Sequence, residues 1–139
     1  MKLSSGLTHL GCSLVALGMV VAAAQPILAD DAWLHLALGA LYVENGPWLG
    51  SEPFLHTATG SPGSHGWLAA IALDRVVGRF GFEGLRFFHA AVVLWILVLV
   101  WRITRRETGS PVVASLVLAG TTLCAGYRLV QLRPELFTI

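Results

Sequence analysis

The stretch DDAWLHLALG, residues 30–39, brings two carboxylates, a tryptophan and a histidine together directly after an apolar run. Asp31 and His35 are spaced four apart, so on a helix they would share one face. A carboxylate there can act as the general base that deprotonates a hydroxyl group. It can equally cap the start of a helix, where unpaired backbone N–H groups favour an anion. The spacing alone leaves both roles open, and capping is the more common one.

Further histidines and carboxylates follow in the same part of the chain. Glu52 and His56 repeat the spacing of Asp31 and His35, and His65 comes shortly afterwards. Imidazole and carboxylate groups are normal ligands of divalent cations. No paired cysteines or histidine pair on one helical turn accompany them. The sequence therefore predicts no metal site and no cofactor, with a divalent cation as the minor alternative.

The composition indicates that these residues belong to a membrane protein. Of the 139 residues, 55% are hydrophobic and 12% are charged, and the mean hydropathy is +0.72. An average soluble domain carries about twice that share of charge. A net charge of +1, without a basic cluster interleaved with aromatics, argues against a nucleic-acid partner. The predicted partner is the lipid bilayer, and Cys12 and Cys124 lie in apolar stretches as ordinary packing residues.

The first predicted transmembrane helix covers residues 10–29, which carry no charge and reach about 30 Å as a helix. A cleaved signal peptide is the alternative, because Lys2, an apolar core and the small residues Ala22, Ala23 and Ala24 resemble its three regions. The further apolar runs favour a retained span.

Two more spans are predicted, at residues 87–101 and 111–127. The first is long enough to cross if Arg86 and Arg102 extend their charged ends outward. The second begins with a proline suited to a first helical turn and is rich in small residues that let helices approach closely. His89 is the only ionisable group near the interior of a span, which argues against an ion channel or transporter.

The loop at residues 102–110 sets the predicted orientation, because it holds three arginines against one acid. The positive-inside rule places such a loop in the cytoplasm. Residues 1–9 are then cytoplasmic, whereas residues 30–86 and 128–139 are extracytoplasmic. The prediction is an all-α, multi-pass membrane protein with three transmembrane helices.

Two helices are expected in the outer segment between the first and second spans. Apolar residues recur at helical spacing over residues 31–43, up to the breaker Asn45-Gly46-Pro47. They recur again from about residue 65 to residue 80, with three charged residues among them. The first fits a helix near the membrane surface, and the second fits an interfacial helix or a helix packed on the bundle surface. The Gly- and Pro-rich stretch between them predicts turns.

Three phrases in this order resemble a family: DDAWLHLALGALYVENG, SEPFLHTATGSPGSHGWL and LRPELFTI. They are similar to bacterial multispanning proteins of the GT-C glycosyltransferase superfamily. That branch shows Asp-x-x-Trp-x-His-Leu-x-x-Gly, then Asp-Pro-Phe-x-x-Thr, then His-Glu-Trp-Leu and Arg-Pro-x-Leu-Phe. The resemblance runs from about residue 28 to the end, and it implies a location in the bacterial inner membrane.

The resemblance implies a transferase that takes a sugar from a polyprenyl-phosphate donor on the outer face and passes it to a hydroxyl acceptor. Asp31 would be the catalytic acid of the first outer loop, with Asp30 beside it. The substrate pocket would be lined by Trp33, His35, His65, Trp67 and Arg133. Arg133 could hold the lipid phosphate or simply extend to the interface, and the tryptophans could stack on a sugar or anchor the chain at the interface.

Two residues depart from the family pattern. Gly66 stands where relatives show glutamate after the histidine, and Glu52 replaces the aspartate before Pro53. Relatives also have many more spans than the three expected here. We therefore expect the amino-terminal fragment of such a transferase, inactive alone. The alternative is a noncatalytic small membrane protein, or a decayed remnant of the same fold, in which Asp30 and Asp31 only cap a helix.

Overall fold

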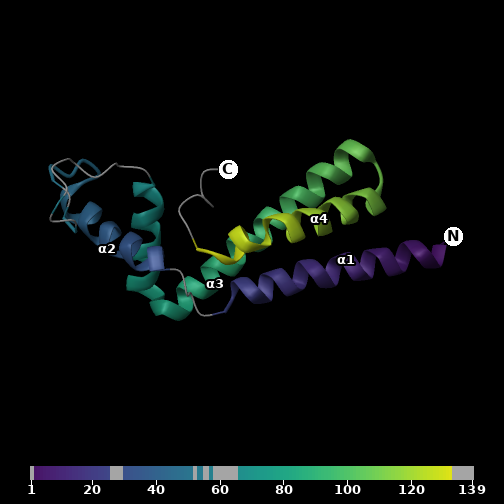
Figure 1. The fold of residues 1–139 in the computed structure, drawn as a ribbon, viewed down its shortest axis with the longest axis horizontal. Helices are drawn as coiled ribbons and strands as arrows, with labels where there is room; N and C mark the ends of the chain where they lie inside the picture. Colours follow the sequence, from purple (N-terminus) through teal and green to yellow (C-terminus); the bar gives the residue numbers. More distant parts are fainter. Residues whose placement is uncertain (1, 26–29, 52, 55–56, 58–65, 133–139) are drawn as a thin grey trace. The chain divides into compact units, whose positions relative to one another are not determined.

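The computed structural model describes residues 2–25, 30–51, 53–54, 57 and 66–132, and its regular structure there is entirely helical (Figure 1). The described elements are α1 (Lys2–Ala23), α2 (Asp30–Asn45), α3 (Trp67–Thr108) and α4 (Pro111–Val130). The predicted all-α class is confirmed. The chain divides into two compact units, one built from residues 1–27 and 86–132 and the other from residues 28–85 and 133–139.

Three of the described helices are long and apolar enough to cross a membrane. The candidate spans are Gly6–Ala23 within α1, the helix α3 and the helix α4. Only 11%, 17% and 33% of their most apolar windows are buried within the chain, so most of their side chains face outward. A multi-pass protein in contact with the lipid bilayer accounts for this exposure, and the three long apolar helices that the sequence predicts are present.

The first helix occupies a different stretch from the one predicted. It begins at Lys2 and ends at Ala23, whereas the sequence suggested residues 10–29, of which 26–29 lie outside the described residues. The polar side chains before Leu10 do not prevent a helix in this stretch. Pro26 explains the earlier end, because the residue before a proline is disfavoured in the helical conformation.

The helix α3 joins two elements that the sequence separated. It contains the predicted helix near residues 65–80 and the predicted span at residues 87–101 without a loop between them. The interruption is confined to Gly81, whose backbone adopts φ 68° and ψ −172°. That region of conformational space is open essentially only to glycine. A single residue thus interrupts the helix between these two predicted elements.

A short connection joins α3 to α4, because α3 continues to Thr108 through most of the predicted loop 102–110. Gly109 has φ +66° and donates its N–H to the carbonyl of Arg105, as a glycine after a helix end commonly does. Ser110 then caps α4 by accepting a hydrogen bond from the Val113 N–H at 3.4 Å, and Pro111 follows in the first turn.

The unit that contains α1, α4 and residues 86–108 of α3 is a three-helix bundle. Its fully or nearly buried side chains include Val93, Leu97, Ala114, Leu118 and Leu129. Gly126 of α4 lies so close to α1 that a Cβ atom there would be 2.9 Å from the terminal methyl of Met19. His9 of α1 and Ser115 of α4 share a hydrogen bond of 2.8 Å between their side chains.

The other unit packs α2 against the first part of α3 through small residues. A Cβ atom at Gly39 would collide with the backbone carbonyl oxygen of Ala70 and lie 2.9 Å from the Cβ of Asp74. Leu73 is completely buried beside this crossing. The absence of a side chain at Gly39 therefore lets the two helix backbones touch.

Candidate functional site

The two predicted catalytic residues open a helix. Asp30 and Asp31 are the first two residues of α2, so both belong to its first turn. Unpaired N–H groups and the helix dipole at such an end stabilise a negative charge. This position suits an ionised carboxylate whether it acts as a cap or as a base. Their side chains lie outside the described part of the structure.

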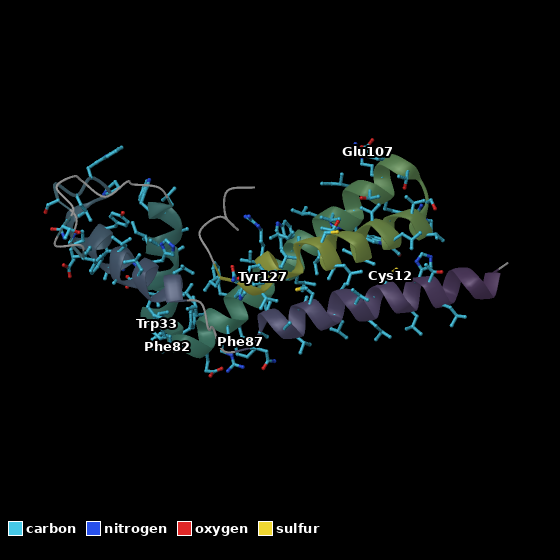
Figure 2. All side chains as sticks on the ribbon, viewed as in Figure 1. Cys12, Trp33, Phe82, Phe87, Glu107 and Tyr127 are labelled. Atoms are coloured by element: carbon cyan, nitrogen blue, oxygen red, sulfur yellow. The ribbon has the colours of Figure 1, made fainter. Side chains whose placement is uncertain are left out.

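An exposed aromatic pair lies near the same end of α2. The rings of Trp33 and Phe82 have centroids 5.3 Å apart and planes inclined at 58° (Figure 2). Both side chains remain more than half exposed, at 57% for Trp33 and 53% for Phe82. A tilted contact of this kind fixes the orientation of both rings while leaving their outer faces open. The pair is an exposed apolar surface, and Trp33 stands three residues after Asp30 in α2.

The contacts between α2 and α3 show that the two helices run in opposite directions. Trp33 meets Phe82, whereas Gly39, further along α2, meets Ala70 and Asp74. Moving forward along α2 thus corresponds to moving backward along α3. The two contacts define the register of this helix pair.

This register separates two of the predicted substrate-binding residues. Trp67 is half-buried at the start of α3, and the helix from there to Phe80 rises by about 20 Å before it reaches the level of Phe82. Trp33 and Trp67 therefore lie at opposite ends of the helix pair. His35 lies half-buried on α2, nearer to Trp33 than to the far end.

Several predicted residues fall outside the described part of the chain. His65 and Arg133 are among them, as are Glu52 and His56 of the alternative metal site. Within the described residues there is no group of three or more His, Cys, Asp or Glu side chains that could hold a metal ion. The side chains of Glu52, His56 and His65 thus lie outside the described residues.

Gly66 has a backbone conformation that explains why glycine stands there. Its φ is +72°, in the left-handed region, and the next residue begins α3. For other residues this conformation costs about 1–2 kcal/mol. The backbone conformation therefore favours glycine at the position where the resembling family shows glutamate.

Phe82 is a residue of this region that the sequence did not predict to lie there. It lies one residue beyond Gly81, in the stretch between the predicted helix near residues 65–80 and the predicted span at residues 87–101. The available signal was an aromatic residue directly after a glycine near a helix end. Nothing in the sequence indicated that its ring would meet Trp33.

A second polar arrangement lies inside the three-helix bundle. His89 is completely buried, and its Nε2 lies 2.9 Å from the carbonyl oxygen of Leu129. Arg86, which we expected to extend its charge outward, instead donates its Nε–H to the carbonyl of Ala24 at 2.9 Å. Both acceptors lie at the carboxyl ends of helices, where carbonyl groups lack partners within the helix. Two side chains of α3 thus satisfy the ends of α1 and α4.

Comparison of the chain with models of known protein families, with curated proteins and with solved structures finds no match.

Proposed function

We propose that this chain contributes the first spans and the first outer segment of a membrane glycosyltransferase. The enzyme would transfer a sugar from a polyprenyl-phosphate donor to a hydroxyl acceptor on the outer face of a bacterial inner membrane. The observation that supports this most is the start of α2, where Asp30 and Asp31 occupy the first turn with the exposed Trp33 directly after them.

In this proposal Asp31 is the general base. Its carboxylate takes the proton of the acceptor hydroxyl while the acceptor oxygen attacks the anomeric carbon of the sugar. The bond from that carbon to the phosphate oxygen breaks, and polyprenyl phosphate leaves with the electron pair. Direct attack of this kind inverts the configuration of the sugar. A helix amino terminus favours the ionised carboxylate that the step requires.

The pair of Trp33 and Phe82 would provide the sugar-binding surface. Their ring faces are exposed next to the first turn of α2, and a sugar ring presents an apolar C–H face that packs on aromatic rings. Anchoring at the membrane interface is the other use of such rings. The two uses differ in their effect on the Michaelis constant for the donor.

A second candidate function is a noncatalytic membrane protein of the same architecture. Gly66 supports it, because its φ of +72° suits glycine at the position where the resembling transferases show an acid. If that glutamate contributes to catalysis in the relatives, this chain lacks its carboxylate. Asp30 and Asp31 would then only stabilise the start of α2.

The two candidate functions are distinguished by a sugar-transfer assay. It uses membranes from cells that express the protein from its complete reading frame. The donors are polyprenyl phosphates, each linked to one radiolabelled hexose or pentose, and the readout is label in an acceptor. Asp31→Asn removes the base, so we expect transfer to fall by about 10²–10⁴-fold. Glu44→Gln, at the exposed far end of α2, is the matched control and should leave transfer unchanged.

Equal transfer by Asp31→Asn and the unaltered protein would exclude the catalytic role of Asp31. Absence of transfer from every donor by the unaltered protein, at normal abundance in the membrane, would instead favour the noncatalytic candidate.

A further inference from the structure

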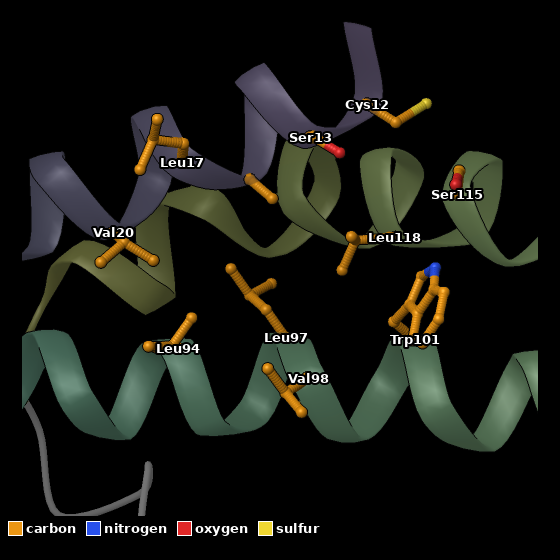
Figure 3. Close-up of a pocket in the computed structure, with 11 residues that line it drawn as sticks. Cys12, Ser13, Leu17, Val20, Leu94, Leu97, Val98, Trp101, Ser115 and Leu118 are labelled. Atoms are coloured by element: carbon orange, nitrogen blue, oxygen red, sulfur yellow. The ribbon is translucent and has the colours of Figure 1, made fainter. Parts of the chain in front are cut away.

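The three-helix bundle contains a groove that the proposed transferase does not use. Its volume is about 470 Å³, within the range of about 300–1,000 Å³ that is usual for ligand pockets. The walls come from all three helices, and Figure 3 shows Leu97 and Trp101 of α3 pointing into the space between them. None of the described residues that line the groove is charged. Its contents must therefore be largely apolar.

The groove follows the helices over about the depth of one membrane leaflet. On α1 it extends from Cys12 to Val20, and on α3 from Leu94 to Trp101. The first of these stretches measures about 12 Å along the helix axis. One half of a hydrocarbon core about 30 Å thick is about 15 Å deep. The groove thus has the length of a hydrocarbon tail within one leaflet.

The cross-section of the groove distinguishes between a tail and a helix as its occupant. A volume of about 470 Å³ over about 12 Å corresponds to a mean cross-section of about 40 Å². A helix with its side chains is at least about 10 Å across and would need about 80 Å². A flexible hydrocarbon chain therefore suits a groove of this width better than a second copy of a span does.

Positive charge gathers at one end of the groove. Trp101 lines that end, and indole side chains favour the head-group level of a bilayer. Arg102, Arg105 and Arg106 follow directly, with Glu107 as the acid among them. Arg105 donates a hydrogen bond to the carbonyl of Gly109. Arg102 and Arg106 are exposed, and neither guanidinium has an ion-pair or hydrogen-bond partner within the described residues.

We propose that the groove binds an acyl chain of an anionic phospholipid from the surrounding bilayer, with the lipid phosphate held by Arg102 and Arg106. Guanidinium groups bind phosphate oxygens through paired N–H donors. The apolar walls exclude the head group and the arginines select its charge. This site lies at the arginine end of the groove, and it does not depend on transferase activity.

The test uses the full chain in phosphatidylcholine nanodiscs that contain a small amount of a photoreactive lipid probe. The probe is either phosphatidylglycerol or phosphatidylcholine, and both carry the same photoreactive acyl chain. After illumination, mass spectrometry locates the crosslinked residues. We expect crosslinks from the phosphatidylglycerol probe at Leu97 and Leu118, inside the groove. Ala16→Trp fills the groove and should lower this crosslinking about tenfold. Leu123→Trp, on the exposed surface of α4 outside the groove, should leave it unchanged.

The charge selection is tested by Arg102→Gln combined with Arg106→Gln, at two exposed positions. Each arginine near an anionic surface contributes about 1 kcal/mol, so the preference for phosphatidylglycerol should fall about 30-fold. Arg75→Gln combined with Arg128→Gln removes the same charge from exposed positions elsewhere and should keep the preference.

Three results would overturn the proposal. The first is crosslinks spread evenly around the three helices, and the second is equal behaviour of Ala16→Trp and Leu123→Trp. The third is crosslinking between two protein copies at the groove, which would identify a helix as its occupant. Equal binding of both lipids by the unaltered chain would overturn the role of the arginines.

Discussion

His89 donates its Nε2–H to the carbonyl oxygen of Leu129 across 2.9 Å, linking α3 to the last turn of α4. A carbonyl oxygen only accepts, so the proton of this bond must come from the ring. The ring is completely buried, and its Nδ1 has no hydrogen-bond partner within the described residues. The bond gives a partner to a carbonyl group that the helix itself leaves unpaired.

Replacing His89 by leucine should therefore destabilise the bundle although it makes the span more apolar. The carbonyl of Leu129 would lose its partner, and we expect the free energy of unfolding to fall by about 1 kcal/mol. Unfolding of the purified chain by SDS titration in mixed micelles measures this change. Phe87→Leu, at a position that is 71% exposed, is the matched control and should have little effect. Equal stability of the two variants would contradict a stabilising role for the bond.

Gly39→Ala should separate α2 from α3. Its Cβ would overlap the backbone carbonyl of Ala70, which cannot move without shifting the helix. We expect a loss of about 1–3 kcal/mol in the free energy of unfolding. Gly78→Ala provides the comparison, because a Cβ at Gly78 meets nothing within 4 Å and alanine is the better helix former. A loss of the same size at Gly78 would show that the close approach at Gly39 is unimportant.

Gly66→Ala tests the left-handed backbone before α3. The substitution should cost about 1–2 kcal/mol, because φ of +72° is strained for any residue with a Cβ. Gly50→Ala is the control, since that glycine does not have a positive φ and has open space around it. Thermal unfolding followed by circular dichroism compares the two variants. If Gly66→Ala is as stable as Gly50→Ala, the backbone at residue 66 does not require glycine.

The contact between Trp33 and Phe82 should appear as an energetic coupling. A double-mutant cycle with alanine at both positions should give a coupling energy of about 0.5–1.5 kcal/mol in unfolding experiments. Leu68 is 64% exposed near the start of α3, at the other end of the helix pair, so a cycle of Trp33 with Leu68 should be additive. Additivity in both cycles would mean that the ring contact contributes nothing to stability.

The sequence predicts the helices of this chain well because their causes are local. Asp30 and Asp31 precede an uninterrupted helical spacing, and α2 spans Asp30–Asn45 where residues 31–43 were expected. Pro111 begins α4 as a first-turn proline should. Length and apolar composition alone identify the three candidate spans.

Contacts between helices do not follow from local sequence patterns. The meeting of Gly39 with Ala70 and of Trp33 with Phe82 depends on the register of two helices, which no local pattern specifies. The same holds for Arg86, whose charge suggested an outward position until its partner, the carbonyl of Ala24, was known. Helix positions follow from neighbours in sequence, whereas these partners follow from packing.

Two glycines with positive φ bound residues 82–108 of α3, a helical stretch whose length is close to the thickness of a membrane. Gly81 and Gly109 both have left-handed φ values, and the helix between them reaches about 40 Å. That length matches a bilayer measured from one head-group layer to the other, about 40–45 Å. In a thinner membrane a segment of fixed length between two such bends has to tilt. If residues 82–108 cross the membrane, a bilayer of different thickness changes the tilt of this stretch and, with it, the height of Trp101 relative to the head groups.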